Sequence, residues 1–161
     1  MILSEYIWGW RSADVVSALV SHYPRPFDFR KNLVVAPNVS WGFGLKYEAD
    51  LLVVSKRHYL TEIEVKVSRS DFRADEKKRK HTLGLHPKVK RFYYAMPENV
   101  WERCTDVWRV PGSGVYVTSF DKNGDPRAKL VMEAKHREVE PLTDDEVLKL
   151  MRLASMRIWK R

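Results

Sequence analysis

The segment from residue 59 to residue 96 constrains the fold more than any other, because it has the pattern of a strand, a helix and a second strand. Apolar and charged side chains alternate over residues 59–67 with the period of two that a β-strand requires. A helix of roughly a dozen residues is expected between Ser68 and Gly84, and residues 89–96 resume a strand. A helix that joins two strands in this way makes them parallel within one sheet.

The rest of the chain supplies further strands and helices to the same fold. The predicted elements are a helix at 12–22 with Ser12 as its N-cap, strands at 33–41 and 49–54, a helical turn after Pro97, strands at 115–120 and 129–134, and a helix at 143–159. This order predicts an α/β fold whose mixed central sheet contains a three-strand meander, a crossover helix and a parallel fourth strand, with helices on its faces. No repeat or linker interrupts the sequence, so residues 1–161 are expected to form one domain.

Composition excludes several classes of protein. Hydrophobic residues make up 44% of the chain and charged residues 31%, which is typical of a globular protein and not of a disordered one. No apolar run approaches the roughly 20 residues that a membrane span needs. The single cysteine, Cys104, cannot form an intramolecular disulfide, and the N-terminus does not resemble a secretory signal. We therefore expect a cytoplasmic protein.

Positive charge is concentrated in one part of the sequence. The chain has a net charge of +8, and residues 66–91 alone contain ten basic and three acidic residues, a local net charge of +7. Such a segment is typical of a surface that binds a polyanion, most often nucleic acid, and the alternative is a solvated helix face. The residues predicted to contact DNA are Arg69, Arg73, Lys77, Lys78 and Lys80.

Acidic residues on two adjacent strands suggest a catalytic site. Asp50 lies on the strand at 49–54 and Glu64 on the next, and facing side chains of an antiparallel hairpin are about 5 Å apart. Two such carboxylates repel each other unless a cation lies between them, and hard oxygen ligands suit Mg²⁺ or Mn²⁺. The backbone carbonyl of Val65 would add a ligand, and Lys66 could orient a water and stabilise charge on a phosphate. These groups predict metal-assisted hydrolysis of a phosphodiester.

Neighbouring polar residues have two interpretations each. Glu48 and Glu62 share the strand parity of Asp50 and Glu64, so each is either an additional metal ligand or, as we expect, a solvated residue outside the site. Ser68 either caps the crossover helix or contacts phosphate. The alternative for the whole group is a cluster of ion pairs on an exposed sheet face, which would contribute little to stability.

Five short motifs extend this pattern. They are Ala49-Asp50-Leu51, Glu64-Val65-Lys66-Val67-Ser68, Asp71-Phe72-Arg73-Ala74-Asp75, Arg91-Phe92-Tyr93-Tyr94-Ala95-Met96-Pro97 and Pro111-Gly112-Ser113-Gly114-Val115. Together they resemble the PD-(D/E)XK nuclease superfamily and, within it, the MmcB-like DNA repair proteins. The resemblance implies a restriction-endonuclease-like core, metal binding by Asp50 and Glu64, and a catalytic role for Lys66. Ala49 stands where the superfamily's name has proline. Some members have an added acid on the first helix, for which this chain offers Asp14 within the helix and Glu5 just before it.

The sequence therefore predicts a Mg²⁺- or Mn²⁺-dependent nuclease that acts on double-stranded or branched DNA in repair, recombination or phage DNA processing. The alternatives are a non-catalytic DNA-binding or structure-recognising module on the same fold and an RNA-directed nuclease. Endonuclease and exonuclease activity are not distinguished. Cutting both strands with one site per chain would favour a homodimer. His81, His86 and Cys104 do not have the spacing of a zinc site.

Overall fold

The computed structural model describes residues 9–40, 42–45, 47–77 and 84–159. The strands are β1 (Asn32–Val39), β2 (Ala49–Ser55), β3 (Leu60–Val65), β4 (Val89–Pro97), β5 (Gly114–Phe120) and β6 (Pro126–Met132). The helices are α1 (Ser12–Val20), α2 (Arg69–Ala74), α4 (Glu98–Glu102) and α5 (Asp144–Trp159), with a short 3-10 helix, η1 (Asp75–Lys77), after α2. The six strands form one sheet in which their spatial order is their order in the chain.

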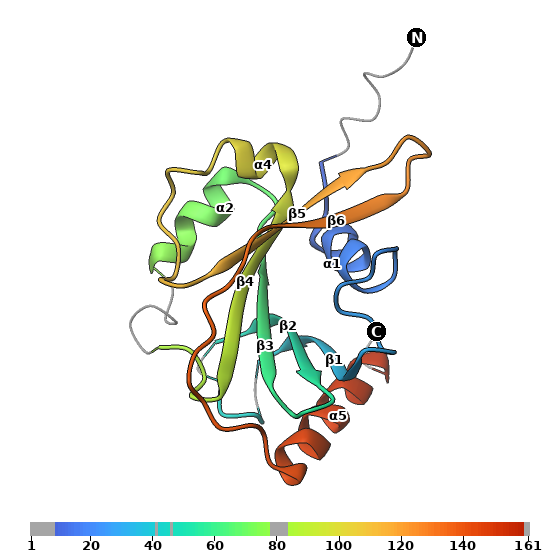
Figure 1. Ribbon diagram of the computed structural model, residues 1–161, viewed down its shortest axis with the longest axis vertical. Coiled ribbons are helices and arrows are strands. Elements are labelled where there is room, and N and C mark those ends of the chain that lie inside the picture. The colour runs from blue at the N-terminus through green and yellow to red at the C-terminus, as the bar shows by residue number, and fades with distance from the viewer. Residues whose placement is uncertain (1–8, 41, 46, 78–83, 160–161) are drawn as a thin grey trace.

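The sheet is mixed, with helices on both faces (Figure 1). Strands β1, β2 and β3 are antiparallel neighbours, and β4 is parallel to β3. The predicted meander, crossover and parallel fourth strand are therefore confirmed. Strand β5 is parallel to β4, and β6 returns antiparallel to β5.

Local capping explains where the helices begin. The predicted cap of α2 is confirmed, because the Ser68 hydroxyl accepts a hydrogen bond from the Asp71 backbone N–H at 3.1 Å. The predicted N-cap of α1 is wrong by one residue. Ser12 is the first helical residue, the N-cap is Arg11, and the Asp14 carboxylate accepts from the Arg11 backbone N–H at 2.9 Å.

The predicted crossover helix and second hairpin differ from the structure in their boundaries. Helix α2 is only six residues long and tightens into η1, and residues 78–83 lie outside the described residues. Strand β6 begins at Pro126, earlier than expected, because Pro126 pairs with Phe120 directly across the Asp121–Asp125 turn. No helix among the described residues is long and apolar enough to cross a membrane.

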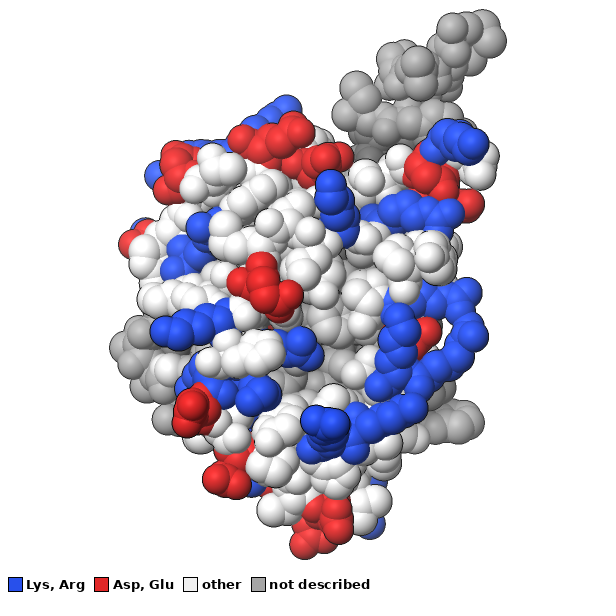
Figure 2. All heavy atoms as spheres, viewed as in Figure 1, with Lys and Arg blue, Asp and Glu red and all other residues white. Residues whose placement is uncertain are grey.

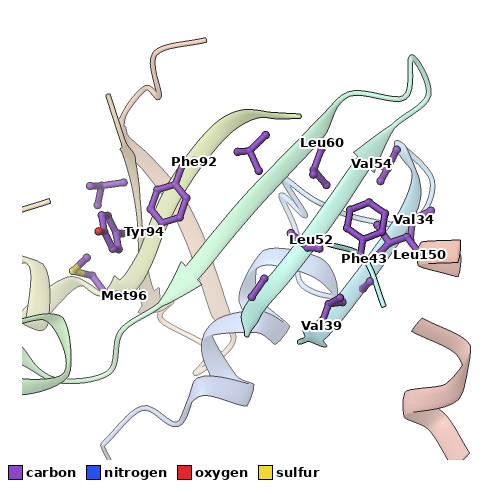
Figure 3. Close-up of a cluster of buried hydrophobic side chains, with 14 of the residues drawn as sticks. Val34, Val39, Phe43, Leu52, Val54, Leu60, Phe92, Tyr94, Met96 and Leu150 are labelled. Carbon is purple, nitrogen blue, oxygen red and sulfur yellow. The ribbon is translucent and has the colours of Figure 1, made fainter. Parts of the chain in front are cut away.

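Apolar side chains fill a core on each face of the sheet. On one face, α1 packs against β6, β3 and β4, and its apolar side chains share a cluster with odd-numbered residues of β2 and β3 such as Leu51 and Ile63. On the other face lies a larger cluster from the strands and from α2, α4 and α5 (Figure 3). In this cluster Leu150 of α5 lies beside Val34 of β1 and Phe43, and α5 packs against the edge strand β1 (Figures 1 and 3). Both faces of β3 are therefore buried along its whole length.

The segment after β6 runs back across the sheet before α5 begins (Figure 1). The backbone N–H of Lys135 donates to the Gly112 carbonyl at 2.9 Å, and the N–H of Arg137 donates to the Lys90 carbonyl at 2.8 Å. The Arg137 guanidinium donates to the Val89 carbonyl at 2.9 Å. These bonds fix the path of the chain from one edge of the sheet to the helix that covers the other.

Close packing at the start of β5 leads to a first prediction. A Cβ atom added at Gly114 would lie 2.6 Å from the backbone nitrogen of Ala134 and would overlap the Tyr93 ring. We expect Gly114→Ala to lower the free energy of unfolding by about 1–3 kcal/mol, measured by urea denaturation. Gly9→Ala is the matched control, since no atom lies within 4 Å of its added Cβ. Equal stability of the two variants would contradict this close approach.

Candidate active site

Strand register brings together the two carboxylates that the sequence singles out. Leu51 pairs with Ile63 in the β2–β3 ladder, so the next positions along the two strands are Asp50 and Glu64. The Asp50 carboxylate accepts a hydrogen bond from the Val65 backbone N–H at 2.7 Å. Asp50 is half-buried, whereas Glu64 is buried. The two acids are therefore neighbours at the end of the hairpin, and Asp50 is the one that solvent partly reaches.

Lys66 is held between two carboxylates. It follows the last residue of β3, and its backbone N–H donates to the Ala95 carbonyl of β4 at 3.0 Å. Its ammonium lies 3.0 Å from Glu64 Oε1 and 2.9 Å from Asp75 Oδ1, and its side chain is 1% exposed. The group is thus a buried ion cluster. The alternative of ion pairs on an exposed sheet face is wrong.

Asp75 is the residue of this cluster that the sequence analysis missed. It is fully buried in η1, and its second carboxylate oxygen accepts from the Tyr94 hydroxyl at 2.6 Å. The same hydroxyl accepts from the Val110 backbone N–H at 3.3 Å. One signal was present: Asp75 follows the apolar Phe72 by three residues, so both lie on the inward face of the crossover helix.

The neighbouring acids have different environments. Glu62, expected in solvent, is fully buried, and its Oε2 accepts from the Tyr47 hydroxyl at 2.6 Å. The expectation failed because β3 is covered on both faces, not on one. Glu48 is exposed, as expected. Ser68 caps α2.

Burial and charge shift several pKa values in this cluster. Burial disfavours the charged form of Lys66, but the carboxylates of Glu64 and Asp75 outweigh it and raise the pKa above the ordinary value. Burial, together with Asp75, raises the pKa of Tyr94, and burial together with Glu62 raises the pKa of Tyr47. At neutral pH Lys66 is therefore a cation and both tyrosines are hydroxyl donors.

The donor set of this cluster fits a hard divalent cation. Asp50 and Glu64 offer carboxylate oxygens. Because the N–H and C=O of one strand residue point to the same side, the Val65 carbonyl faces the side of the strand on which Asp50 binds its N–H. No group of three or more His, Cys, Asp or Glu side chains with metal-binding geometry occurs within the described residues. A metal here would therefore rest on two carboxylates and a carbonyl, with water completing its shell.

The basic residues predicted to bind DNA fall into three groups. Arg69 forms an ion pair with Asp106 at 3.0 Å and also donates to the Arg103 carbonyl. Arg73 and Lys77 are exposed on α2 and η1. Lys78 and Lys80 lie outside the described residues. Asp14 lies on α1, which packs on the opposite face of the sheet, and it pairs with Arg11 at 3.2 Å, so it does not join the cluster.

Comparisons with known proteins bear on the fold only. No protein-family model and no curated protein matches the sequence. A solved structure of a protein of unknown function from Silicibacter pomeroyi is similar, with a TM-score of 0.57 and 19% identity. The match covers 95% of this chain and 87% of that chain. It shows a shared mixed α/β architecture and does not bear on the chemistry.

The ion cluster leads to a prediction about stability. Lys66→Met would leave Glu64 and Asp75 buried without their shared cation, so we expect the free energy of unfolding to fall by about 3–5 kcal/mol. Arg69→Met, which breaks an exposed ion pair, is the control and should change stability little. Urea denaturation of both variants measures the difference. A Lys66→Met protein as stable as the control would contradict a tightly coupled cluster.

The same cluster predicts how this contribution depends on pH. The pKa of Lys66 is raised on folding, so its stabilisation is complete below the ordinary lysine value of 10.5 and is lost as the pH rises through the folded value. The stability difference between wild type and Lys66→Met should therefore stay constant from neutral pH to about pH 10 and shrink above it. A difference that shrinks already between pH 7 and pH 9 would mean that Lys66 loses its proton earlier than this environment allows.

Proposed function

We propose that this protein is a metal-dependent nuclease that hydrolyses phosphodiester bonds of DNA, in repair, recombination or phage DNA processing. The observation that carries the proposal is the meeting of Asp50, Glu64 and Lys66 at the ends of β2 and β3. Two carboxylates and an ammonium within one small site are groups suited to metal-assisted phosphodiester hydrolysis. They share this site only because the hairpin register and the buried cluster hold them there.

Each residue has a distinct role in this proposal. Asp50, Glu64 and the Val65 carbonyl would hold Mg²⁺ or Mn²⁺, which would supply Lewis-acid stabilisation of charge on the phosphate. Lys66 stays protonated at neutral pH, so it would orient a water and stabilise negative charge, and would not act as a base. An ammonium has three N–H donors, and Glu64 and Asp75 occupy two sides of it, so the third would be the one to contact a water or phosphate that enters this buried site.

The fold supports the same proposal. The antiparallel meander, the crossover helix and the parallel fourth strand are the topology that the resemblance to PD-(D/E)XK nucleases implies. We infer a restriction-endonuclease-like core from this topology together with the positions of Asp50, Glu64 and Lys66 within it. Exposed Arg73 and Lys77 lie on the connection that follows Lys66, where they could contact the substrate backbone.

One observation favours a second candidate, a non-catalytic DNA-binding module on the same fold. Lys66 is 1% exposed and is paired with two carboxylates, an arrangement that would also stabilise the sheet without any catalytic role. Such a protein would bind nucleic acid in a salt-dependent manner and would not cleave it.

Cleavage assays separate the two candidates. Linear, circular and branched DNA and an RNA of matched sequence are incubated with the protein in Mg²⁺ or Mn²⁺, with EDTA as the metal-free control. We expect metal-dependent cleavage that Glu64→Gln or Asp50→Asn lowers by about 100-fold or more, because each variant removes a charged ligand. Asp145→Asn, an exposed carboxylate on α5, is the matched control and should keep full activity.

The outcomes of this assay exclude one another. Full activity in Glu64→Gln would overturn the assignment of the site. Binding without cleavage of any substrate would favour the non-catalytic module, and preferential cleavage of the RNA would redirect the proposal to RNA. Thermal unfolding of each variant shows whether a lost activity reflects lost structure.

A further inference from the structure

A second basic surface is assembled from two segments that are far apart in the sequence. Strand β1 begins at Asn32 and β2 ends at Ser55, and these two residues are register partners in the sheet. The residues just before Asn32 and just after Ser55 therefore lie next to each other. We call this the basic edge surface, and it consists of Arg30, Lys31, Lys56 and Arg57, all of them exposed.

The charges of the basic edge surface are poorly compensated. Like charges on neighbouring strand ends destabilise a sheet, so four cations here cost stability. Within the described part of the chain, the one carboxylate at ion-pair distance from these side chains is Asp28, 3.9 Å from Arg30 Nε. That carboxylate also accepts from the backbone N–H groups of Arg30 and Lys31, at 3.1 and 3.0 Å. Asp144 lies nearby but faces His58, 3.7 Å away.

The space-filling view agrees with this local excess of positive charge. Figure 2 shows Lys and Arg side chains in a nearly continuous band at the lower right, over the segment between α1 and β1 and the turn between β2 and β3. A concentration of cations that costs folding stability and has little internal compensation is suited to an external polyanion.

Two aromatic side chains distinguish this surface from a simple basic patch. Phe29 precedes Arg30 and is 69% exposed, and Tyr23, in the same segment, is 74% exposed. Large aromatic rings this open to water do not stabilise a core. Cations beside exposed rings are the combination that binds single-stranded nucleic acid, because phosphates pair with the cations while unpaired bases stack on the rings.

We propose that the basic edge surface, with Phe29 and Tyr23, binds single-stranded nucleic acid. This inference deepens the proposed nuclease function. It rests on that function for the claim that the bound nucleic-acid strand is led to the site at Asp50. Asp50 is near the start of β2 and Lys56 follows its end, so the two sites are about 20 Å apart along the strand. A strand anchored at the basic edge surface would thus have a free portion that reaches the catalytic end of the hairpin.

Binding is measured apart from cleavage, in EDTA, by fluorescence anisotropy with an oligothymidine of about 20 nucleotides. We expect the double variant Lys31→Glu/Lys56→Glu to weaken binding by about tenfold or more and to lower the dependence of affinity on salt. Phe29→Ala should weaken binding to oligothymidine but not to an abasic strand of the same length. The charge control is Lys122→Glu/Lys129→Glu, which reverses two exposed cations on the β5–β6 hairpin and should leave the affinity within about twofold.

The outcomes distinguish this inference from the nuclease proposal. Wild-type affinity in Lys31→Glu/Lys56→Glu would overturn the binding surface, even if the protein cleaves DNA. Equal or tighter binding of a duplex of the same length, with no effect of Phe29→Ala, would overturn the single-stranded ligand. The protein could bind oligothymidine through this surface and cleave no substrate. That result would support the binding surface and contradict the proposed nuclease function.

Discussion

The structure depends on how the central strand β3 accommodates charge. Covered on both faces, it still carries Glu62 and Glu64 and is followed directly by the buried Lys66. Burying such groups costs several kcal/mol each unless partners compensate for lost hydration. Three other segments supply these partners. Tyr47, in the loop before β2, donates to Glu62. Asp75 of η1 pairs with Lys66, and Tyr94 of the neighbouring strand β4 donates to Asp75. The crossover connection is thus held to the sheet by the polar contacts of Asp75 as well as by the apolar Phe72.

Sequence periodicity predicted the backbone better than it predicted burial. Alternation along residues 59–67 predicted the hairpin and allowed Asp50 to lie next to Glu64, and the strand register of the structure then puts the two at neighbouring positions. The same alternation suggested that the charged face of β3 was open to water. Whether that face is covered depends on η1 and the loop that carries Tyr47 packing over it, which is a tertiary event that strand periodicity does not encode. Glu62 and Asp75 were misjudged for this reason.

Electrostatics in this protein operate at two depths. At the end of the hairpin where Asp50 and Glu64 lie, the charges of Glu64, Lys66 and Asp75 are buried and mutually paired, so they act within a small volume. At the other end of the hairpin, Lys31 and Lys56 are exposed and largely uncompensated. The linear charge distribution pointed to residues 66–91 and overlooked this end, because its four cations come from two separate pairs that only strand pairing unites. The hairpin therefore has buried, paired charges at one end and exposed cations at the other.

The packing of α5 against β1 has a consequence for how the chain is made. The strands of the first hairpin are synthesised before Leu142, Val147 and Leu150, which complete their core. Until those residues emerge, the apolar side chains of Val34, Leu52 and Val54 lack their cover. The larger core is therefore completed only after α5 has been synthesised, and until then the nascent chain exposes apolar side chains of the first hairpin, which favours aggregation.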